Sequence, residues 1–282
     1  MSAPAGFDAQ RFKAQERAGF NRIAARYAEG AHLRADLAAA LLNAAELAPG
    51  QRVLDLASGP GLLARDAATR IAPDGWVLAS DIAEDMLAEG ARRATAEGRC
   101  SLTFAAADAE HLCLPDASVD RVLAGLALFM FPHPEQALAE MRRVLRPGGR
   151  VALSVWGPRE AVPLISRAQD CIARLLPAPK VARPSVFRFG DAATITAALD
   201  AAGFSDVRVT PCPFTCRFAT ADAYWQAFLD LAGGAAEALS RLPEDTQRAL
   251  REAVATELDA HRAADGSGYV VDALALVASA RK

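Results

Sequence analysis

One segment constrains the fold more than any other, and it reads Val53-Leu54-Asp55-Leu56-Ala57-Ser58-Gly59-Pro60-Gly61. Apolar residues interrupted by a single acid predict a buried strand, and the two glycines predict a tight turn directly after it. The pattern of residues 61–68 then predicts a helix. A strand, a glycine turn and a helix in immediate succession are typical of an α/β sheet in which the backbone can approach a ligand.

The chain continues this alternation beyond residue 68. Strands are predicted over residues 52–56, 76–81, 102–106, 119–124 and 150–155, with helices over 85–97 and 133–145 between them. A Pro-Gly-Gly turn at residues 147–149 precedes the fifth strand. Alternating strands and helices indicate βαβ units. We therefore expect an α/β fold with a doubly wound, mostly parallel, seven-stranded Rossmann-like sheet.

Three regions are expected along the chain. Residues 1–48 form an N-terminal helical cap, helical over 11–47, and residues 49–157 form the ligand-binding core. Residues 158–282 complete the sheet, contribute a helical insertion and cover the site. In this last region, helices are predicted over 191–202, 221–239 and 243–262, and strands over 207–210 and 268–280.

Composition narrows the classes of function. The 282 residues carry a net charge of −3, which gives no reason to expect a nucleic acid or an anionic membrane surface as a partner. No apolar run reaches the roughly 18–20 residues that a membrane span needs. The N-terminus lacks the regions of a signal peptide. The five cysteines are scattered, without Cys-x-x-Cys spacing, so we expect reduced thiols, a cytoplasmic protein and no metal site.

Three acids carry the chemical information. Gly59 and Gly61 have no Cβ that would block a ligand. Asp81 ends the second strand 20 residues after Gly61, where a carboxylate can accept both hydroxyls of a ribose. Asp108 follows the third strand and can accept from the amine of an adenine, while the next backbone N–H binds a ring nitrogen. Asp55 lies inside an apolar strand, where it needs a partner.

The Gly-x-Gly-x-x-Ala spacing from Gly59 to Ala64 also fits a nicotinamide dinucleotide. Asp55 argues against that alternative, because a pyrophosphate at this turn would be repelled by a carboxylate so close to it. A cofactor with a positive charge and an ammonium group would instead be attracted to the Asp55 carboxylate. Because the glycine spacing still fits, an NAD(P)-dependent oxidoreductase is kept as the second hypothesis.

Four segments in order resemble the motifs of the class I S-adenosylmethionine-dependent methyltransferases. They are residues 54–61, 80–87, 107–116 and 140–150, which match motif I, the acid-helix motif, the "GDAxxLPF-D" segment and the "E-RVLKPGG" segment. Residues 20–27 resemble the "F--IA--Y" helix of the ubiquinone/menaquinone-biosynthesis type, to which the chain is most similar. The resemblance covers residues 50 to about 156 and becomes loose after Pro158.

The resemblance implies S-adenosyl-L-methionine as cofactor. Asp55 and Gly59 would border its methionine part, Asp81 its ribose, and Asp108 with Ala109 its adenine. Tyr27 would cover the donor pocket. The full set of expected cofactor residues is Tyr27, Asp55, Ala57, Gly59, Gly61, Asp81, Ile82, Met86, Asp108, Ala109, Ala124 and Gly125.

The sequence indicates less about the methyl acceptor than about the cofactor. The family often has a histidine-containing segment after the fourth strand, but residues 126–134 are more apolar here. We therefore expect a small, largely apolar or aromatic acceptor, methylated on oxygen or carbon, in a pocket lined by Phe129, Met130 and Trp156. No base is assigned, and His133 and Tyr27 are the weak candidates. A methyltransferase-fold binding subunit without turnover is a further alternative. The oligomeric state is open, with a homodimer as one option.

Overall fold

The structure is a computed structural model that describes residues 7–98, 101–177 and 183–282. Its seven strands form one sheet in the order β3-β2-β1-β4-β5-β7-β6. The pairs from β3 to β5 are parallel, and β7 runs antiparallel to both β5 and β6. The expected doubly wound, mostly parallel α/β sheet is therefore confirmed.

The strands carry the apolar runs found in the sequence. Their bounds are β1 Arg52–Leu56, β2 Trp76–Asp81, β3 Leu102–Ala106, β4 Val119–Gly125, β5 Leu145–Trp156, β6 Ser205–Phe218 and β7 Tyr269–Arg281. The predicted strands over 52–56, 76–81 and 102–106 match the first three of these bounds. β1 is buried from Val53 to Leu56, as a central strand covered on both faces requires.

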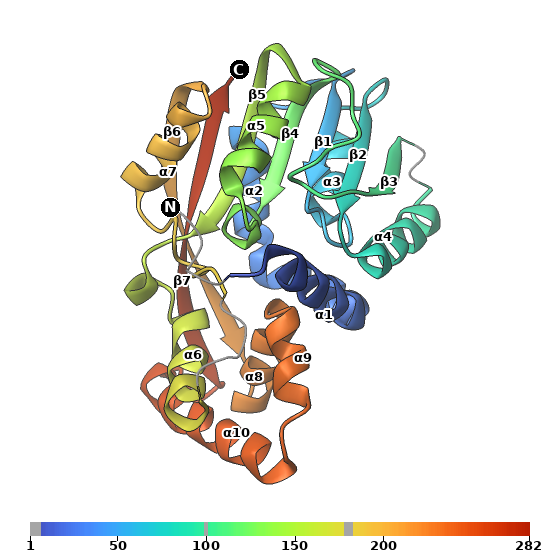
Figure 1. Ribbon diagram of the computed structural model, residues 1–282. Coiled ribbons are helices and arrows are strands. Elements are labelled where there is room, and N and C mark those ends of the chain that lie inside the picture. The colour runs from blue at the N-terminus through green and yellow to red at the C-terminus, as the bar shows by residue number, and fades with distance from the viewer. Residues whose placement is uncertain (1–6, 99–100, 178–182) are drawn as a thin grey trace.

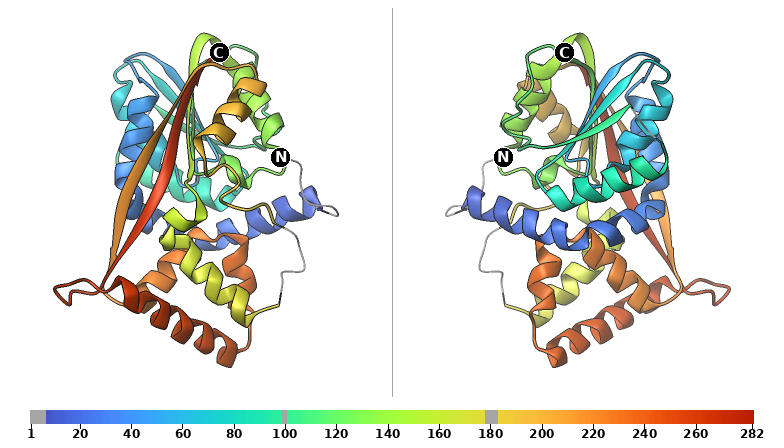
Figure 2. Two further views of the ribbon diagram at one scale, coloured as in Figure 1. Left: turned by 90° about the vertical axis from the view of Figure 1, so that its left-hand side faces the viewer. Right: turned by 90° about the vertical axis from the view of Figure 1, so that its right-hand side faces the viewer.

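Helices cover both faces of the sheet. In the side views, the sheet lies between α2 and α3 on one side and α5 and α7 on the other (Figure 2). The helices are α1 Ala9–Glu29, α2 Ala35–Ala44, α3 Leu62–Arg70, α4 Glu84–Ala96, α5 Pro134–Val144, α6 Pro163–Leu175, α7 Ala192–Ala201, α8 Ala221–Leu231, α9 Gly234–Ser240 and α10 Glu244–Leu258.

Strand β6 is longer than the sequence predicts. The strand predicted over 207–210 was too short, since β6 continues through Pro211 and Pro213 to Phe218. β6 is the edge strand of the sheet and pairs only with β7 among the described residues, so a missing N–H on its free side is tolerated. The turn at 147–149 is also different, since it lies within β5 where the register with β4 shifts.

Two predicted helices are broken. The region 11–47 divides into α1 and α2 at a 3-10 turn, Gly30–Arg34. The region 221–239 divides into α8 and α9 at Gly233, whose φ of 50° suits glycine. The break lets α9 approach α1 closely, because a Cβ on Gly19 would lie only 2.3 Å from the nitrogen of Gly234.

The β6–β7 hairpin extends past the end of β5. Trp156 of β5 pairs with Ala275, whereas the hairpin continues to the pair Phe218–Tyr269. Helices α6, α8 and α10 gather around this extension (Figure 1). Helix α1 lies between that helical region and the carboxyl ends of the parallel strands. The fold thus places α1 directly over the edge where parallel sheets bind ligands.

Candidate functional site

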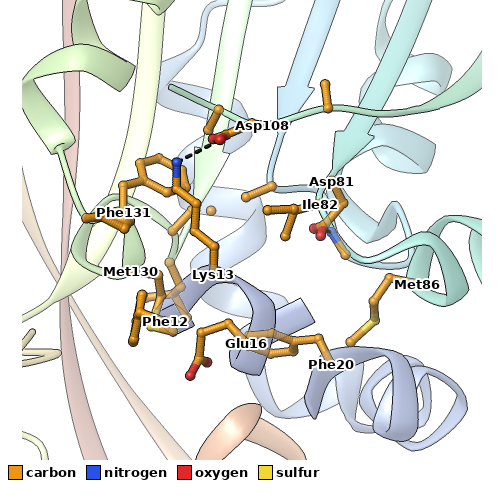
Figure 3. Close-up of a pocket in the computed structure, with 18 of the residues that line it drawn as sticks. Phe12, Lys13, Glu16, Phe20, Asp81, Ile82, Met86, Asp108, Met130 and Phe131 are labelled. Atoms are coloured by element: carbon orange, nitrogen blue, oxygen red, sulfur yellow. Dashed lines mark hydrogen bonds and ion pairs between the residues drawn. The ribbon is translucent and has the colours of Figure 1, made fainter. Parts of the chain in front are cut away.

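A cavity of about 120 Å³ lies between α1 and the carboxyl ends of β1, β2, β3 and β4. Each strand contributes the residues that directly follow it, and α1 contributes one helical face (Figure 3). Ten of the predicted residues line this cavity: Tyr27, Ala57, Gly59, Asp81, Ile82, Met86, Asp108, Ala109, Gly125 and Met130. The fold therefore brings together side chains that are separated by up to about 100 positions in sequence.

The turn after β1 has the backbone that the glycines predict. Gly59 and Gly61 have φ values of 54° and 69°. A Cβ on Gly61 would lie 2.9 Å from the ring of Phe104, so a side chain there would collide as well as strain the backbone. Gly61 begins α3 but lines neither of the two cavities described here.

Asp81 ends β2 and ties the two neighbouring turns together. One carboxylate oxygen accepts from the Gly59 nitrogen and the other from the Ala83 nitrogen, each at 2.8 Å. Burial raises the pKa of Asp81 despite these backbone hydrogen bonds. The side chain borders the cavity beside Ile82 (Figure 3).

Asp108 follows β3 and holds a salt bridge to helix α1. Its Oδ2 lies 2.7 Å from the Lys13 ammonium, and its Oδ1 accepts from the Glu110 nitrogen at 3.0 Å. Burial alone would raise the pKa of Asp108, but Lys13 and the Glu110 N–H outweigh burial and hold that pKa below its ordinary value. Asp108 is therefore a carboxylate across the neutral pH range.

Asp55 lies in the interior of β1 with no solvent exposure. Its Oδ2 accepts from the Ala64 nitrogen at 3.0 Å, whereas its Oδ1 has no hydrogen-bond partner. Burial raises the pKa of Asp55 to about 8, the Ala64 bond lowers it, and the charge of Asp81 raises it further. The acid is thus costly in the folded chain, and a cation beside Oδ1 would relieve that cost.

A second cavity of about 560 Å³ lies beside the first, between α2 and α3. Four residues line both cavities: Tyr27, Ala57, Gly125 and Leu126. Asp55 borders the second cavity, and so does Arg34, which is 9% exposed and has an Nη2 without a hydrogen-bond partner. The Arg34 guanidinium lies 4.5 Å from the centre of the Tyr27 ring. One cavity therefore holds two incompletely paired groups that can carry opposite charges.

Backbone strain marks the place where the cavities meet. Ala57 follows β1 with a φ of 52°, and Leu126 follows β4 with a φ of 51°. Such left-handed conformations cost a residue with a Cβ roughly 1 kcal/mol or more. Strain of this kind clusters at functional sites. Five non-glycine residues among those described have a positive φ; Ala57 and Leu126 line both cavities, whereas Glu46, Ala117 and Asp206 line neither.

Some predicted residues lie elsewhere. Phe129 and Trp156 are 4% exposed, belong to the hydrophobic core and line neither cavity. The ring of Trp156 packs against that of Phe214, with 6.2 Å between the ring centroids. Ala124 is buried within β4. His133 precedes α5 with an exposed ring 3.6 Å from Glu135, and it borders neither cavity. These four residues are not brought to the site by the fold.

Other wall residues escaped the sequence analysis. Helix α1 supplies Phe12, Lys13, Glu16 and Phe20, and the 3-10 turn Gly30–Arg34 supplies Arg34. A signal for Arg34 exists, because it shares an apolar stripe with Leu37 and Leu41, three and seven residues away. A charge on such a stripe is buried, which marks it as a candidate. The positions on α1 have helical spacing, but that spacing does not reveal which face meets the strands.

Within the described ranges, no group of three or more His, Cys, Asp or Glu side chains could hold a metal ion. In the same ranges, no helix is long and apolar enough to cross a membrane.

One segment of the chain is similar to methyltransferase domains. Residues 53–149 match the family model described as a methyltransferase domain, and these residues include β1 to the start of β5. The chain is also similar to proteins of the UbiE type. It is 41% identical over 150 residues to the ubiquinone/menaquinone biosynthesis C-methyltransferase UbiE of Bordetella avium, a match that covers 51% of this chain and 58% of that protein.

A second relative supports the same placement. The UbiE protein of Ralstonia pickettii is 42% identical over 120 residues, with 41% of this chain and 49% of that protein covered. The chain thus spans about half the length of the curated relatives it matches.

Solved structures show the same fold. Protein BH2331 from Bacillus halodurans C-125 aligns with a TM-score of 0.60 at 20% identity, over 87% of this chain and 98% of that one. The cyclase SpnF aligns with a TM-score of 0.52 at 21% identity, over 87% and 79%. Because a cyclase shares the fold, the fold alone does not decide the reaction.

Proposed function

We propose that the chain binds S-adenosyl-L-methionine across the two cavities and transfers its methyl group to a small, largely apolar or aromatic acceptor. Transfer to carbon is favoured over transfer to oxygen, because the relatives with 41–42% identity carry the name C-methyltransferase. The methyltransferase domain at residues 53–149 supports the reaction class.

The second cavity carries the proposal. An amino-acid end presents an ammonium and a carboxylate side by side. The unpartnered Oδ1 of Asp55 can accept from that ammonium, and the unpartnered Nη2 of Arg34 can donate to that carboxylate. Both atoms belong to residues that border the same 560 Å³ cavity. An amino-acid head group therefore offers a partner to each of the two groups.

The first cavity suits the nucleoside end. We assign the ribose hydroxyls to Asp81 and the adenine amine to Asp108, with the Ala109 N–H on a ring nitrogen. Ile82 and Met86 supply apolar walls for the base. Gly59, in the glycine turn, and the residues Ala57 and Gly125 would border the middle of the ligand.

The chain's own residues act by placement. When bound, the sulfonium supplies an activated methyl group, so the protein needs to align the acceptor and exclude water. Tyr27, Ala57, Gly125 and Leu126 surround the junction of the cavities, where we place the methyl group. Met130 and Phe131 form an apolar wall beside it, which fits an apolar acceptor.

The alternatives of the sequence analysis are not favoured. A nicotinamide dinucleotide would place its pyrophosphate beside Asp55, whose carboxyl cannot supply the positive charge that a pyrophosphate needs. A binding subunit without turnover would keep the donor site, so it is distinguished only by assaying turnover. Tritiated methyl transfer to a panel of hydroxybenzenes and hydroxynaphthalenes makes that distinction.

Partners and location follow as lesser proposals. We propose a small-molecule acceptor and a reducing, cytoplasmic environment, which the four free cysteines Cys113, Cys171, Cys212 and Cys216 support. Cys100 lies outside the described residues. The absence of a nucleic-acid partner and the option of a homodimer stay predictions.

Calorimetry tests donor binding. S-adenosylhomocysteine should bind the wild-type chain, and Asp81→Asn should weaken binding at least tenfold, because the second ribose hydroxyl loses its acceptor. Asp85→Asn is the control, since Asp85 is exposed on the first turn of α4 nearby. An absence of binding heat in the wild type, or equal affinity in Asp81→Asn, would contradict the proposal.

A further inference from the structure

Lys13 occupies the middle of the first cavity. Its side chain extends from α1 to Asp108, with Met130 and Phe131 on one side and Asp81 on the other (Figure 3). The ammonium lies 2.7 Å from Asp108 Oδ2 and 2.5 Å from Glu110 Oε2. A lysine in this position takes up space and hydrogen-bonding capacity at the point where the proposed adenine would bind.

Both oxygens of Asp108 accept hydrogen bonds from within the chain. Lys13 donates to Oδ2, and the Glu110 nitrogen donates to Oδ1. The adenine amine therefore meets a carboxylate whose cavity-side oxygen already accepts from a cation. Burial lowers the pKa of Lys13, but Asp108 and Glu110 outweigh it and raise that pKa above its ordinary value, so the cation persists.

Glu110 gives Lys13 a second place to bind. The Glu110 side chain is 2% exposed, and its other oxygen accepts from the His133 nitrogen at 2.7 Å. Lys13 can therefore release Asp108 and keep its bond to Glu110. Helix α1 also stays attached to α4, because Arg17 pairs with Glu84 and Asn21 accepts from the Asp85 nitrogen.

We propose that Lys13 is a gating residue for the donor: it holds Asp108 while the cavity is empty and must release it before an adenine can bind there. The inference rests on the proposed function, because it takes Asp108 as the acceptor for the adenine amine. Two consequences follow. Lys13 lowers the affinity for the donor, and the contact fastens α1 over the empty cavity.

Calorimetry with S-adenosylhomocysteine tests the first consequence. Lys13→Met keeps the length of the side chain but removes the charge, so it should bind about three- to tenfold more tightly than the wild type. Lys13→Arg keeps the ion pair and should bind like the wild type. The matched control Arg17→Met removes an exposed ion pair of α1 outside the cavity and should change affinity less than twofold.

A gain of affinity distinguishes gating from a structural role, since mere damage to α1 would weaken binding. Equal or weaker binding by a folded Lys13→Met chain overturns the gating proposal. If neither the wild type nor Lys13→Met binds S-adenosylhomocysteine, the proposed function fails instead.

Hydrogen exchange of the ligand-free chain tests the second consequence without a donor. Amides of residues 9–19 in α1 should exchange faster in Lys13→Met than in the wild type, and those in Arg17→Met should change less. Equal exchange in Lys13→Met and the wild type contradicts the fastening of α1.

Discussion

The two cavities are built in opposite ways. In the first, both oxygens of Asp81 and of Asp108 have partners within the chain. In the second, Asp55 Oδ1 and Arg34 Nη2 are buried without partners. In the first cavity Asp81 is therefore already positioned before a ligand arrives and Lys13 occupies Asp108, whereas the second cavity contains an electrostatic cost that a ligand would relieve.

This difference explains what each cavity contributes. A preorganised carboxylate such as Asp81 selects for shape and hydrogen-bond pattern, since its position is already fixed by two turns. A buried carboxyl such as Asp55 destabilises the folded chain once it ionises, and a cationic ligand group beside it would offset that cost. The second cavity should therefore show the larger conflict between stability and binding. The following predictions test that contrast in order of expected effect.

Asp55 should make the fold sensitive to pH. Its pKa is about 8 in the folded chain against an ordinary 3.8, so the folded state holds the proton more tightly than the unfolded state. The free energy of unfolding should therefore fall as pH rises from about 4 to about 8. Asp55→Asn removes this group, and its free energy of unfolding should fall less steeply by about 1 kcal/mol per pH unit between pH 5 and 7.

Urea denaturation at several pH values measures this slope. Asp85→Asn, on the exposed surface, serves as the control and should keep the wild-type slope. An unchanged slope in Asp55→Asn would mean that the pKa of Asp55 is not raised in the folded chain.

Arg34→Met should separate binding from stability. Loss of the guanidinium should weaken S-adenosylhomocysteine about 10- to 100-fold, or about 1.4–2.7 kcal/mol, because its carboxylate loses a charged donor. Adenosine, which has no amino-acid end, should bind as before. The free energy of unfolding should stay the same or rise, since the buried and incompletely paired Arg34 guanidinium is removed.

The matched control is Arg26→Met, which removes an exposed arginine of α1. A parallel loss of adenosine and S-adenosylhomocysteine affinity in Arg34→Met would show that Arg34 supports the first cavity rather than the second.

Ala57→Gly should have the smallest effect. Glycine relieves the left-handed strain of roughly 1 kcal/mol but makes the unfolded chain more flexible, so stability should change by less than about 1 kcal/mol. Ala88→Gly, on the exposed face of α4, should instead cost about 1 kcal/mol, because no strain is relieved there. Thermal melting compares the two variants, and equal losses would argue against strain at Ala57.

The same contrast separates what the sequence could predict from what it could not. Asp81 ends one strand and Asp108 comes shortly after another, both strands can be predicted from local apolar runs, and parallel strands bring their carboxyl ends together. Lys13 and Arg34 precede the ligand-binding core predicted over residues 49–157. Only tertiary packing decides that α1 covers the strand ends. For the same reason, Phe129 and Trp156 resembled pocket residues but pack into the core.

Strand β6 shows a similar limit. Its two prolines argue against a strand unless its position at the sheet edge is known, and that position depends on pairing with β7, over 50 residues later. The break at Gly233 likewise reflects the close approach of α9 to α1. Local patterns therefore predict the core well, whereas contacts between distant segments decide the covering region.

A crystal structure of the chain with S-adenosylhomocysteine bound tests the central claim most directly, namely that the two cavities are halves of one donor site. We predict the adenine beside Asp108 with Lys13 released toward Glu110, and the amino-acid end between Asp55 and Arg34. A ligand confined to one cavity, or an amino-acid end that contacts neither Asp55 nor Arg34, would contradict the account.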